Sequence, residues 1–345
     1  MTQNTIKKNP PIYVVDAGST LCTLTGLPPK GGQTSLHTIT IPHLVAKLDH
    51  NTEYAPTTVQ LRNKKDILDQ YVFGHGISDN ALMDTTIDLY DTKTRVASIY
   101  GAILSSGLSL PEYNIIITVP LDAIFKLKDG VYVKDVDKVL KIRKLFNDNP
   151  YINISPNRDK QVKLNCIDVK PEGLATLFDV YYDDLGKPVK NLQHDTNFIC
   201  DLGSATTQLL HTYGTKITKT NIDFNVNGTY FNQRIIARYK LIEGTRLTNT
   251  QVNQMLHTNS VNPDILEHTL DWYIDELRTT GLNSRSISSG KFDHIIITGS
   301  LATLLGKERF ADLLGADNIV IAPKASTGRG VYKVHLNKVS MRKRG

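Results

Sequence analysis

The alternation of apolar and polar positions divides the chain into short strands and longer helices. Short runs rich in β-branched and aromatic residues predict strands, and apolar residues that recur every three or four positions predict helices. The predicted strands are 12–15, 38–42, 57–61, 71–76, 113–120, 161–169, 198–202 and the start of 293–306. The predicted helices are 80–108, 134–147, 171–182, 229–241, 262–277 and the end of 293–306. Because strands and helices alternate, we expect an α/β fold.

Two segments carry clear boundary signals. Asn262 can cap the helix that follows it, and Pro263 suits the first helical position. The polar segment 183–196, which contains Gly186 and Pro188, is predicted to connect two halves of the chain.

One pattern, apolar-x-Asp-x-Gly-Ser-small, occurs twice, in residues 14–20 and 199–205. Each copy follows a predicted strand, at the point where the chain would turn back as a hairpin. Asp16 and Asp201 are therefore separated by about half the chain. The simplest arrangement is two similar α/β domains that face each other, each presenting an equivalent turn.

Such a turn suits phosphate chemistry. Glycine permits close backbone approach, and backbone N–H groups together with Ser and Thr hydroxyls can bind phosphate oxygens. An aspartate can hold a hydrated Mg²⁺ through water. One such turn alone is more typical of a capped hairpin, whereas two copies and a third glycine turn at 297–302 favour a nucleotide site. Neither a P-loop nor a G-x-G-x-x-G motif occurs.

Composition narrows the class of protein. The chain has 345 residues, 40% hydrophobic and 21% charged, which is typical of a globular protein of about two domains. Its net charge of +6 is too mild to indicate DNA binding by itself. No apolar stretch approaches the roughly 20 residues of a membrane helix, and residues 1–11 do not resemble a signal peptide. We therefore expect a cytoplasmic protein.

The cysteines and the basic tail have ordinary interpretations. Three cysteines without C-x-x-C spacing predict buried thiols rather than disulfides or zinc ligands. The basic tail is expected to be a solvated, frayed terminus, with contact to phosphate or to a neighbouring subunit as the alternative. It consists of Lys338, Arg342, Lys343 and Arg344.

Taken together, the three turns resemble the motifs of the actin-like ATPase superfamily, which includes actin, the Hsp70 ATPase domain and sugar kinases. Residues 16–23 resemble its first phosphate motif, 201–207 its second and 297–302 its adenosine motif. The resemblance implies an α/β fold of two facing actin-like (RNase H-like) domains with a nucleotide cleft between them. Domain I would comprise residues 1–176 with a C-terminal return at 325–345, and domain II residues 177–324.

Within this superfamily the chain is most similar to the bacterial plasmid-segregation actins, the ParM group. The softer matches are 71–76, 117–120, 170–173 and 323–330. The resemblance implies an ATP (or GTP) hydrolase that requires Mg²⁺ and whose hydrolysis is coupled to assembly into a polar filament of its own copies. It would segregate plasmid DNA through a DNA-binding adaptor on a centromere-like site, without direct sequence-specific DNA contact and without a membrane.

The resemblance also implies roles for single residues. Glu172 and Asp201 would be catalytic, with Glu172 orienting the attacking water, and Asp16 and Asp201 would hold Mg²⁺ through water. The nucleotide would be bound by Asp16, Gly18, Ser19, Thr20, Thr23, Gly203, Ser204, Ala205, Thr206, Gly299 and Ser300, the last two beside adenine. The alternative for Glu172 is a solvated residue at a helix start.

Thr23 departs from the family pattern. Actin-like filament proteins usually carry a lysine there, which meets the β and γ phosphates. Thr23 supplies a hydroxyl but no charge, so the balancing charge is expected from Mg²⁺ or from elsewhere, and the preference between ATP and GTP stays open. Lys30 is close in sequence but matches no motif.

Two other functions compete with the filament hypothesis. A sugar or acid kinase of the same superfamily would commonly carry large insertions and a catalytic aspartate for the acceptor hydroxyl, and we find no convincing candidate. A chaperone-like or shape-determining relative would need a substrate domain or an amphipathic membrane-binding end, for which the sequence shows no pattern.

Overall fold

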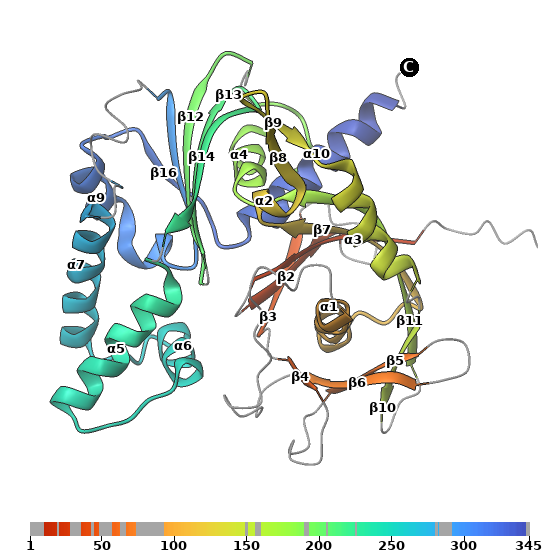
Figure 1. The fold of residues 1–345 in the computed structure, drawn as a ribbon, viewed down its shortest axis with the longest axis horizontal. Helices are drawn as coiled ribbons and strands as arrows, with labels where there is room; N and C mark the ends of the chain where they lie inside the picture. Colours follow the sequence, from red (N-terminus) through yellow and green to blue (C-terminus); the bar gives the residue numbers. More distant parts are fainter. Residues whose placement is uncertain are drawn as a thin grey trace, which may run out of the picture.

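The computed structural model places the strands in two separate sheets and a small hairpin (Figure 1). The structure describes residues 10–18, 21–27, 36–42, 45–47, 57–62, 67–73, 93–148, 151–155, 160–189, 193–204, 206–224, 226–279, 282 and 292–342. Within these residues, no helix is long and apolar enough to cross a membrane.

The first sheet has nine strands in the order β3-β2-β1-β7-β11-β10-β5-β6-β4. Their bounds are β1 (Ile12–Ala17), β2 (Leu21–Gly26), β3 (His37–Pro42), β4 (Val45–Lys47), β5 (Thr57–Arg62), β6 (Ile67–Phe73), β7 (Glu112–Val119), β10 (Tyr151–Ser155) and β11 (Lys160–Pro171). β1 turns back on β2 as an antiparallel hairpin, whereas β1, β7 and β11 run parallel. The predicted hairpin at the first Asp-x-Gly-Ser turn is therefore confirmed.

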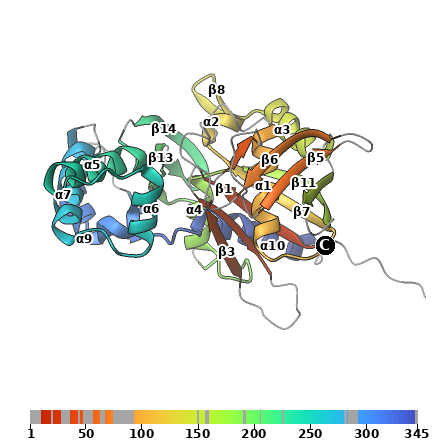
Figure 2. The same ribbon diagram turned by 90° about the horizontal axis from the view of Figure 1, so that it is seen from below.

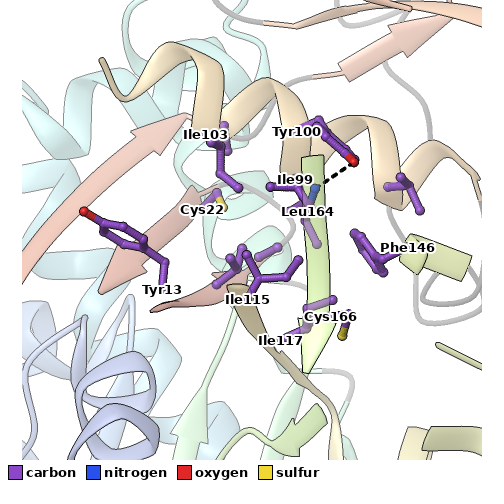
Figure 3. Packing of buried hydrophobic residues seen from close by; sticks show 14 of the residues in the cluster. Tyr13, Cys22, Ile99, Tyr100, Ile103, Ile115, Ile117, Phe146, Leu164 and Cys166 are labelled. Carbon is purple, nitrogen blue, oxygen red and sulfur yellow. Dashed lines mark hydrogen bonds between the residues drawn. The ribbon is translucent and has the colours of Figure 1, made fainter. Parts of the chain in front are cut away.

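Both faces of the central strands are covered. Ile115 and Ile117 of β7 pack with α1 (Lys93–Ser105) and α3 (Val136–Asp148), while Ile116 packs toward α10 (Ser326–Arg342). Such double burial explains the run of three isoleucines, residues 115–117, in the middle of β7. In Figure 3 Tyr100 of α1 lies among these side chains, and its hydroxyl accepts a hydrogen bond from the Leu164 amide at 3.2 Å.

The second sheet repeats this plan with five strands in the order β14-β13-β12-β15-β16. Their bounds are β12 (Thr196–Leu202), β13 (Thr207–Tyr213), β14 (Lys216–Phe224), β15 (His294–Gly299) and β16 (Ile319–Ile321). β12 again forms a hairpin with the next strand and lies parallel to a later one, β15. One face is covered by α5 (Gly228–Ile242), α6 (Asn249–His257), α7 (Pro263–Thr279) and α9 (Ala302–Leu314).

Two helices fill the space between the sheets, α4 (Leu174–Tyr181) and α10 (Figures 1 and 2). Leu177 of α4 packs against Ile199 and Ile296 of the second sheet. On its other side, α4 contacts α10, which in turn packs against β1 and β2 of the first sheet. The domain boundary expected at residues 176 and 177 falls within α4.

Several expectations need correction. Residues 80–92 lie outside the described residues, and the helix predicted to reach residue 108 ends at Ser105, because the chain turns at Gly107 with φ +77°. The basic tail is not frayed at Lys338 and Arg342, which belong to α10. Residues 343–345 lie outside the described residues, as do residues 74–76 of the predicted strand 71–76. Sequence reasoning also missed α6, the short helix α2 (Leu121–Ile124), and the hairpin of β8 (Phe125–Lys128) and β9 (Val131–Lys134).

The three cysteines are buried free thiols, as predicted.

Candidate functional site

Asp16 lies near the end of β1, where the hairpin turn begins. Its Oδ1 accepts a hydrogen bond from the Thr118 hydroxyl of β7 at 2.8 Å. Burial raises the pKa of the Asp16 carboxyl, against the lowering effect of the Thr118 hydrogen bond and of the Arg95 guanidinium. The carboxylate is thus anchored by one neighbouring strand, β7.

Glu172 follows β11 and precedes α4. Its backbone amide donates to the Val119 carbonyl at 2.8 Å, which fixes it beside the end of β7. The side-chain Oε1 is buried and has no hydrogen-bond partner. Burial and the nearby charges of Asp16 and Asp201 raise the pKa of Glu172 well above its usual value. A buried carboxyl of this kind does not fit the alternative of a solvated residue at a helix start.

Asp201 reaches the same place from the second sheet. It lies in β12, and the backbone N–H of Gly173 donates to its carboxylate. Burial and the charge of Asp16 raise the pKa of Asp201 to about 7. Gly173 adopts φ +40°, and a Cβ there would meet Leu210 Cδ1 of β13 at 2.5 Å, so the link between the sheets depends on glycine.

The charges of the three carboxyls repel one another, and the buried Oε1 of Glu172 has no hydrogen-bond partner. Groups whose neutral forms are favoured in this way are stabilised in their charged forms by a cation. Within the described residues, no three His, Cys, Asp or Glu side chains are arranged to ligate a metal directly. The donor set suits a hard, hydrated cation such as Mg²⁺, to which Asp16 and Asp201 would be joined through water.

The second Asp-x-Gly-Ser turn packs against the start of α5. Gly228 donates its N–H to the Gly203 carbonyl at 3.0 Å, and Thr229 donates to the Ser204 carbonyl at 2.8 Å. A Cβ on Gly228 would lie 2.8 Å from the Ser204 Cα, so the helix start approaches the turn closely. Thr206 follows the turn, whereas Ala205 lies outside the described residues.

The third turn lies beside the second. Gly299, at the end of β15, is paired in register with Leu202, the residue before Gly203. It adopts φ +99°, and a Cβ there would overlap the Leu202 backbone. Ser300 follows it, before α9 begins. The structure therefore brings Gly203 and Ser204 close to Gly299 and Ser300 at one end of the second sheet.

The first turn is described in part. Gly18 is described, whereas Ser19 and Thr20 lie outside the described residues. Thr23 of β2 is paired in register with Asp16, and opposite residues of an antiparallel pair project from the same face of the sheet. Its hydroxyl is buried and has no hydrogen-bond partner.

Sequence reasoning missed two polar residues of this site. Gln208 of β13 is paired with Asp201, is only 1% exposed, and has an amide oxygen without a hydrogen-bond partner. The predicted hairpin after Asp201 could have revealed it, because pairing across that turn places 208 opposite 201. Arg95 of α1 donates from its guanidinium to the Ala17 carbonyl. No local pattern indicates that contact, because 78 residues separate the two.

Comparison with known proteins identifies the fold. No family model and no curated protein matches the chain. Among solved structures, the apo ParM protein of psk41 matches at 20% identity and TM-score 0.61, over 97% of this chain and 99% of its own. An archaeal actin homologue matches at 14% identity and TM-score 0.66, over 96% and 99%. Bacillus thuringiensis ParM, solved with ATP, matches at 14% identity and TM-score 0.64, over 97% and 100%.

These matches span nearly the full length of both chains. The chain therefore has the actin-like α/β fold that its three turns led us to expect, the fold of ParM and of the archaeal actin homologue. At these identities the similarity concerns the fold, and the function rests on the residues of the site.

Proposed function

We propose that this protein is a cytomotive, actin-like ATPase that binds ATP, or GTP, with Mg²⁺ at the junction of its two sheets. The observation that carries the proposal is the convergence of Asp16, Glu172 and Asp201 from both sheets on one buried place. Burial raises the pKa of all three carboxyls, and the charge of Asp16 raises those of Glu172 and Asp201 further. Such a cluster is costly to keep without a cation, and a cost of this kind is typical of functional sites.

Each residue then has a specific task. Asp16 and Asp201 would hold Mg²⁺ through its water shell, and Glu172 would orient the water that attacks the γ-phosphate. Phosphoryl transfer depends mainly on positioning and charge stabilisation, so carboxyls that meet only where two domains meet can make hydrolysis depend on domain closure. The turns that carry Gly18, Ser19, Thr20, Gly203, Ser204 and Thr206 would bind phosphate oxygens, with Thr23 as a further hydroxyl, and Gly299 and Ser300 would flank adenine.

The domain division supports such closure. We propose that residues 1–176 with 325–345 form domain I and residues 177–324 domain II, joined through α4 and α10. Since Glu172 immediately precedes α4 and Asp201 belongs to the second sheet, a rotation about these helices changes the distance between the two carboxyls.

The biological role extends this proposal. The protein would polymerise into polar filaments in the cytoplasm, hydrolyse nucleotide within them and move plasmid DNA through a DNA-binding adaptor. A polar filament needs a heterologous interface between identical copies. Three free, buried thiols are typical of a reducing compartment.

The test is nucleotide-dependent assembly. Purified protein is mixed with Mg-ATP, Mg-GTP or a non-hydrolysable analogue, followed by light scattering and examined by negative-stain electron microscopy. We expect filaments with one of the triphosphates, and their shortening after hydrolysis. A protein that binds nucleotide but stays monomeric at every concentration would contradict the segregation role and direct attention to a small-molecule phosphate acceptor.

A further inference from the structure

β2, the strand that follows the first phosphate turn, carries Thr23 at the position where related filament proteins usually have a lysine, so it supplies no positive charge there. Thr23 is 5% exposed, lies opposite Asp16, and its hydroxyl oxygen has no hydrogen-bond partner. The hydroxyl can therefore accept or donate a hydrogen bond at the site, but it cannot offset the charge of a triphosphate. Together with the carboxylates of Asp16 and Glu172, a bound triphosphate would leave this side of the site strongly negative.

A buried arginine approaches the same turn from the other face of the sheet. Arg95 is the third residue of α1 and is only 5% exposed. Its guanidinium donates a hydrogen bond to the carbonyl of Ala17, the residue immediately before Gly18. Since arginine stays protonated even when it is buried, this position carries a permanent positive charge directly beneath the turn.

The positive charge of Arg95 acts on carboxyls at the ends of two strands of the first sheet, β1 and β11. It favours the charged forms of Asp16 and Glu172, which come from β1 and from the end of β11. On β2, burial raises the pKa of Cys22 to about 12, and the charge of Arg95 opposes that rise. Charges in a buried environment interact more strongly than in water, so Arg95 does not need to touch a group to stabilise its negative charge.

We propose that Arg95 supplies the fixed positive charge of the triphosphate site that Thr23 does not provide. This inference rests on the proposed nucleotide site. Arg95 acts as a positioning and charge-balancing residue: one N–H holds the Ala17 carbonyl and so shapes the turn, while the guanidinium charge offsets the phosphates bound above it. The positive charge is supplied by Arg95 on α1. A lysine at the position of Thr23 on β2 is then not needed.

A purely structural role for Arg95 makes different predictions. If Arg95 only holds the Ala17 carbonyl, its loss should weaken every ligand of the site equally, including one without phosphate. If its charge matters, the loss should grow with the negative charge of the ligand. Two substitutions separate the roles: Arg95→Gln keeps an N–H donor but removes the charge, and Arg95→Lys keeps the charge but loses the planar fork.

The experiment measures the affinities of Mg-ATP and of adenosine by displacement of a fluorescent nucleotide, with melting temperatures as the folding control. We expect Arg95→Gln to weaken ATP binding about tenfold or more and adenosine binding less than twofold. Arg95→Lys should keep ATP affinity within threefold. Thr23→Lys, added to Arg95→Gln, should recover most of the lost ATP affinity by placing the charge at the usual position.

The outcomes distinguish the two levels of the proposal. A wild-type protein that binds no nucleotide would contradict the proposed function itself. Wild-type binding with unchanged ATP affinity in Arg95→Gln, or an equal loss for ATP and adenosine, would overturn the role of the charge alone. Should Arg95→Gln fail to fold, Arg95→Lys still decides: a loss of ATP affinity beyond tenfold, shared by adenosine, overturns the proposal.

Discussion

Lys333 of α10 and Asp179 of α4 form a buried ion pair, with 2.7 Å between Nζ and Oδ1 and only 5% and 6% of the two side chains exposed. Asp179 also accepts a hydrogen bond from the Ser326 hydroxyl at 2.7 Å and pairs with Arg329 at 3.1 Å. These contacts join the two helices that lie between the sheets. Sliding one helix along the other would leave buried charges unpaired, so the network fixes their register.

Removing the carboxylate of this network should therefore be costly. Asp179→Ala leaves Lys333 buried with only Asp184, at 3.4 Å, as its charged partner among the described residues. We expect a loss of about 3 to 5 kcal/mol in the free energy of unfolding, measured by urea denaturation. Asp148→Ala is the control, because it removes an exposed partner of Lys144 and should cost below about 1 kcal/mol. Equal losses in the two variants would show that burial does not govern the network.

The same helix pair depends on a glycine. A Cβ on Gly330 of α10 would overlap the carbonyl oxygen of Ala175 on α4 and lie 2.8 Å from the Asp179 amide. Gly330→Ala should therefore lower the free energy of unfolding by at least about 2 kcal/mol, even though alanine is about 1 kcal/mol more favourable than glycine within a helix. Ser340→Ala, on the exposed end of α10, tests propensity without this contact and should change stability little. A Gly330→Ala variant as stable as the wild type would mean that the helices can separate without cost.

The sequence predicted the strands and turns that carry the site because both are local. The repeated Asp-x-Gly-Ser pattern located Asp16 and Asp201 near the ends of equivalent strands, and the glycine turn at 299 follows β15. In contrast, α10 was missed as a helix because small and polar residues such as Gly328, Gly330 and Lys333 share its buried face with Val331 and Tyr332, which interrupts the apolar periodicity.

Contacts between distant segments could not be predicted in this way. The hydrogen bond from Arg95 to Ala17 depends on how α1 packs under β1, and no spacing rule encodes that packing. The approach of Glu172 to Asp201 depends on α4, whose apolar residues pack against the second sheet. Sequence patterns therefore identified the turns, whereas their electrostatic coupling required the tertiary structure.

The raised pKa of Asp201 predicts how stability depends on pH without nucleotide. Because its pKa is about 7 in the folded protein against 3.8 ordinarily, the native state retains a proton that the unfolded state has lost. The contribution of Asp201 to the free energy of unfolding is therefore greatest near pH 4. It decreases by up to about 4 kcal/mol as the pH rises through 7. Asp201→Asn should raise the melting temperature at pH 8 and leave it nearly unchanged at pH 4.

Asp293→Asn is the matched control for this pH series. Hydrogen bonds from Thr196 lower the pKa of Asp293, so its charged form stabilises the folded protein at higher pH. Its substitution should lower the melting temperature at pH 8, opposite in sign to Asp201→Asn. If Asp201→Asn lowers the melting temperature at pH 8, as Asp293→Asn is expected to do, the carboxyl cluster does not carry the electrostatic cost that we assign to it.

Gln208 lies beside Glu172, and under the proposed function its amide would help Glu172 to orient the attacking water. A Cβ on Gly173, the residue after Glu172, would lie 3.6 Å from the Gln208 amide oxygen, which has no hydrogen-bond partner. Under the proposed function, Gln208→Ala should slow phosphate release at least about tenfold in single-turnover assays, while ATP affinity stays within threefold, because positioning of the water is lost and not binding. Gln251→Ala, in the first turn of α6, should change neither quantity. Wild-type hydrolysis by Gln208→Ala would exclude Gln208 from water positioning and leave Glu172 to act without it.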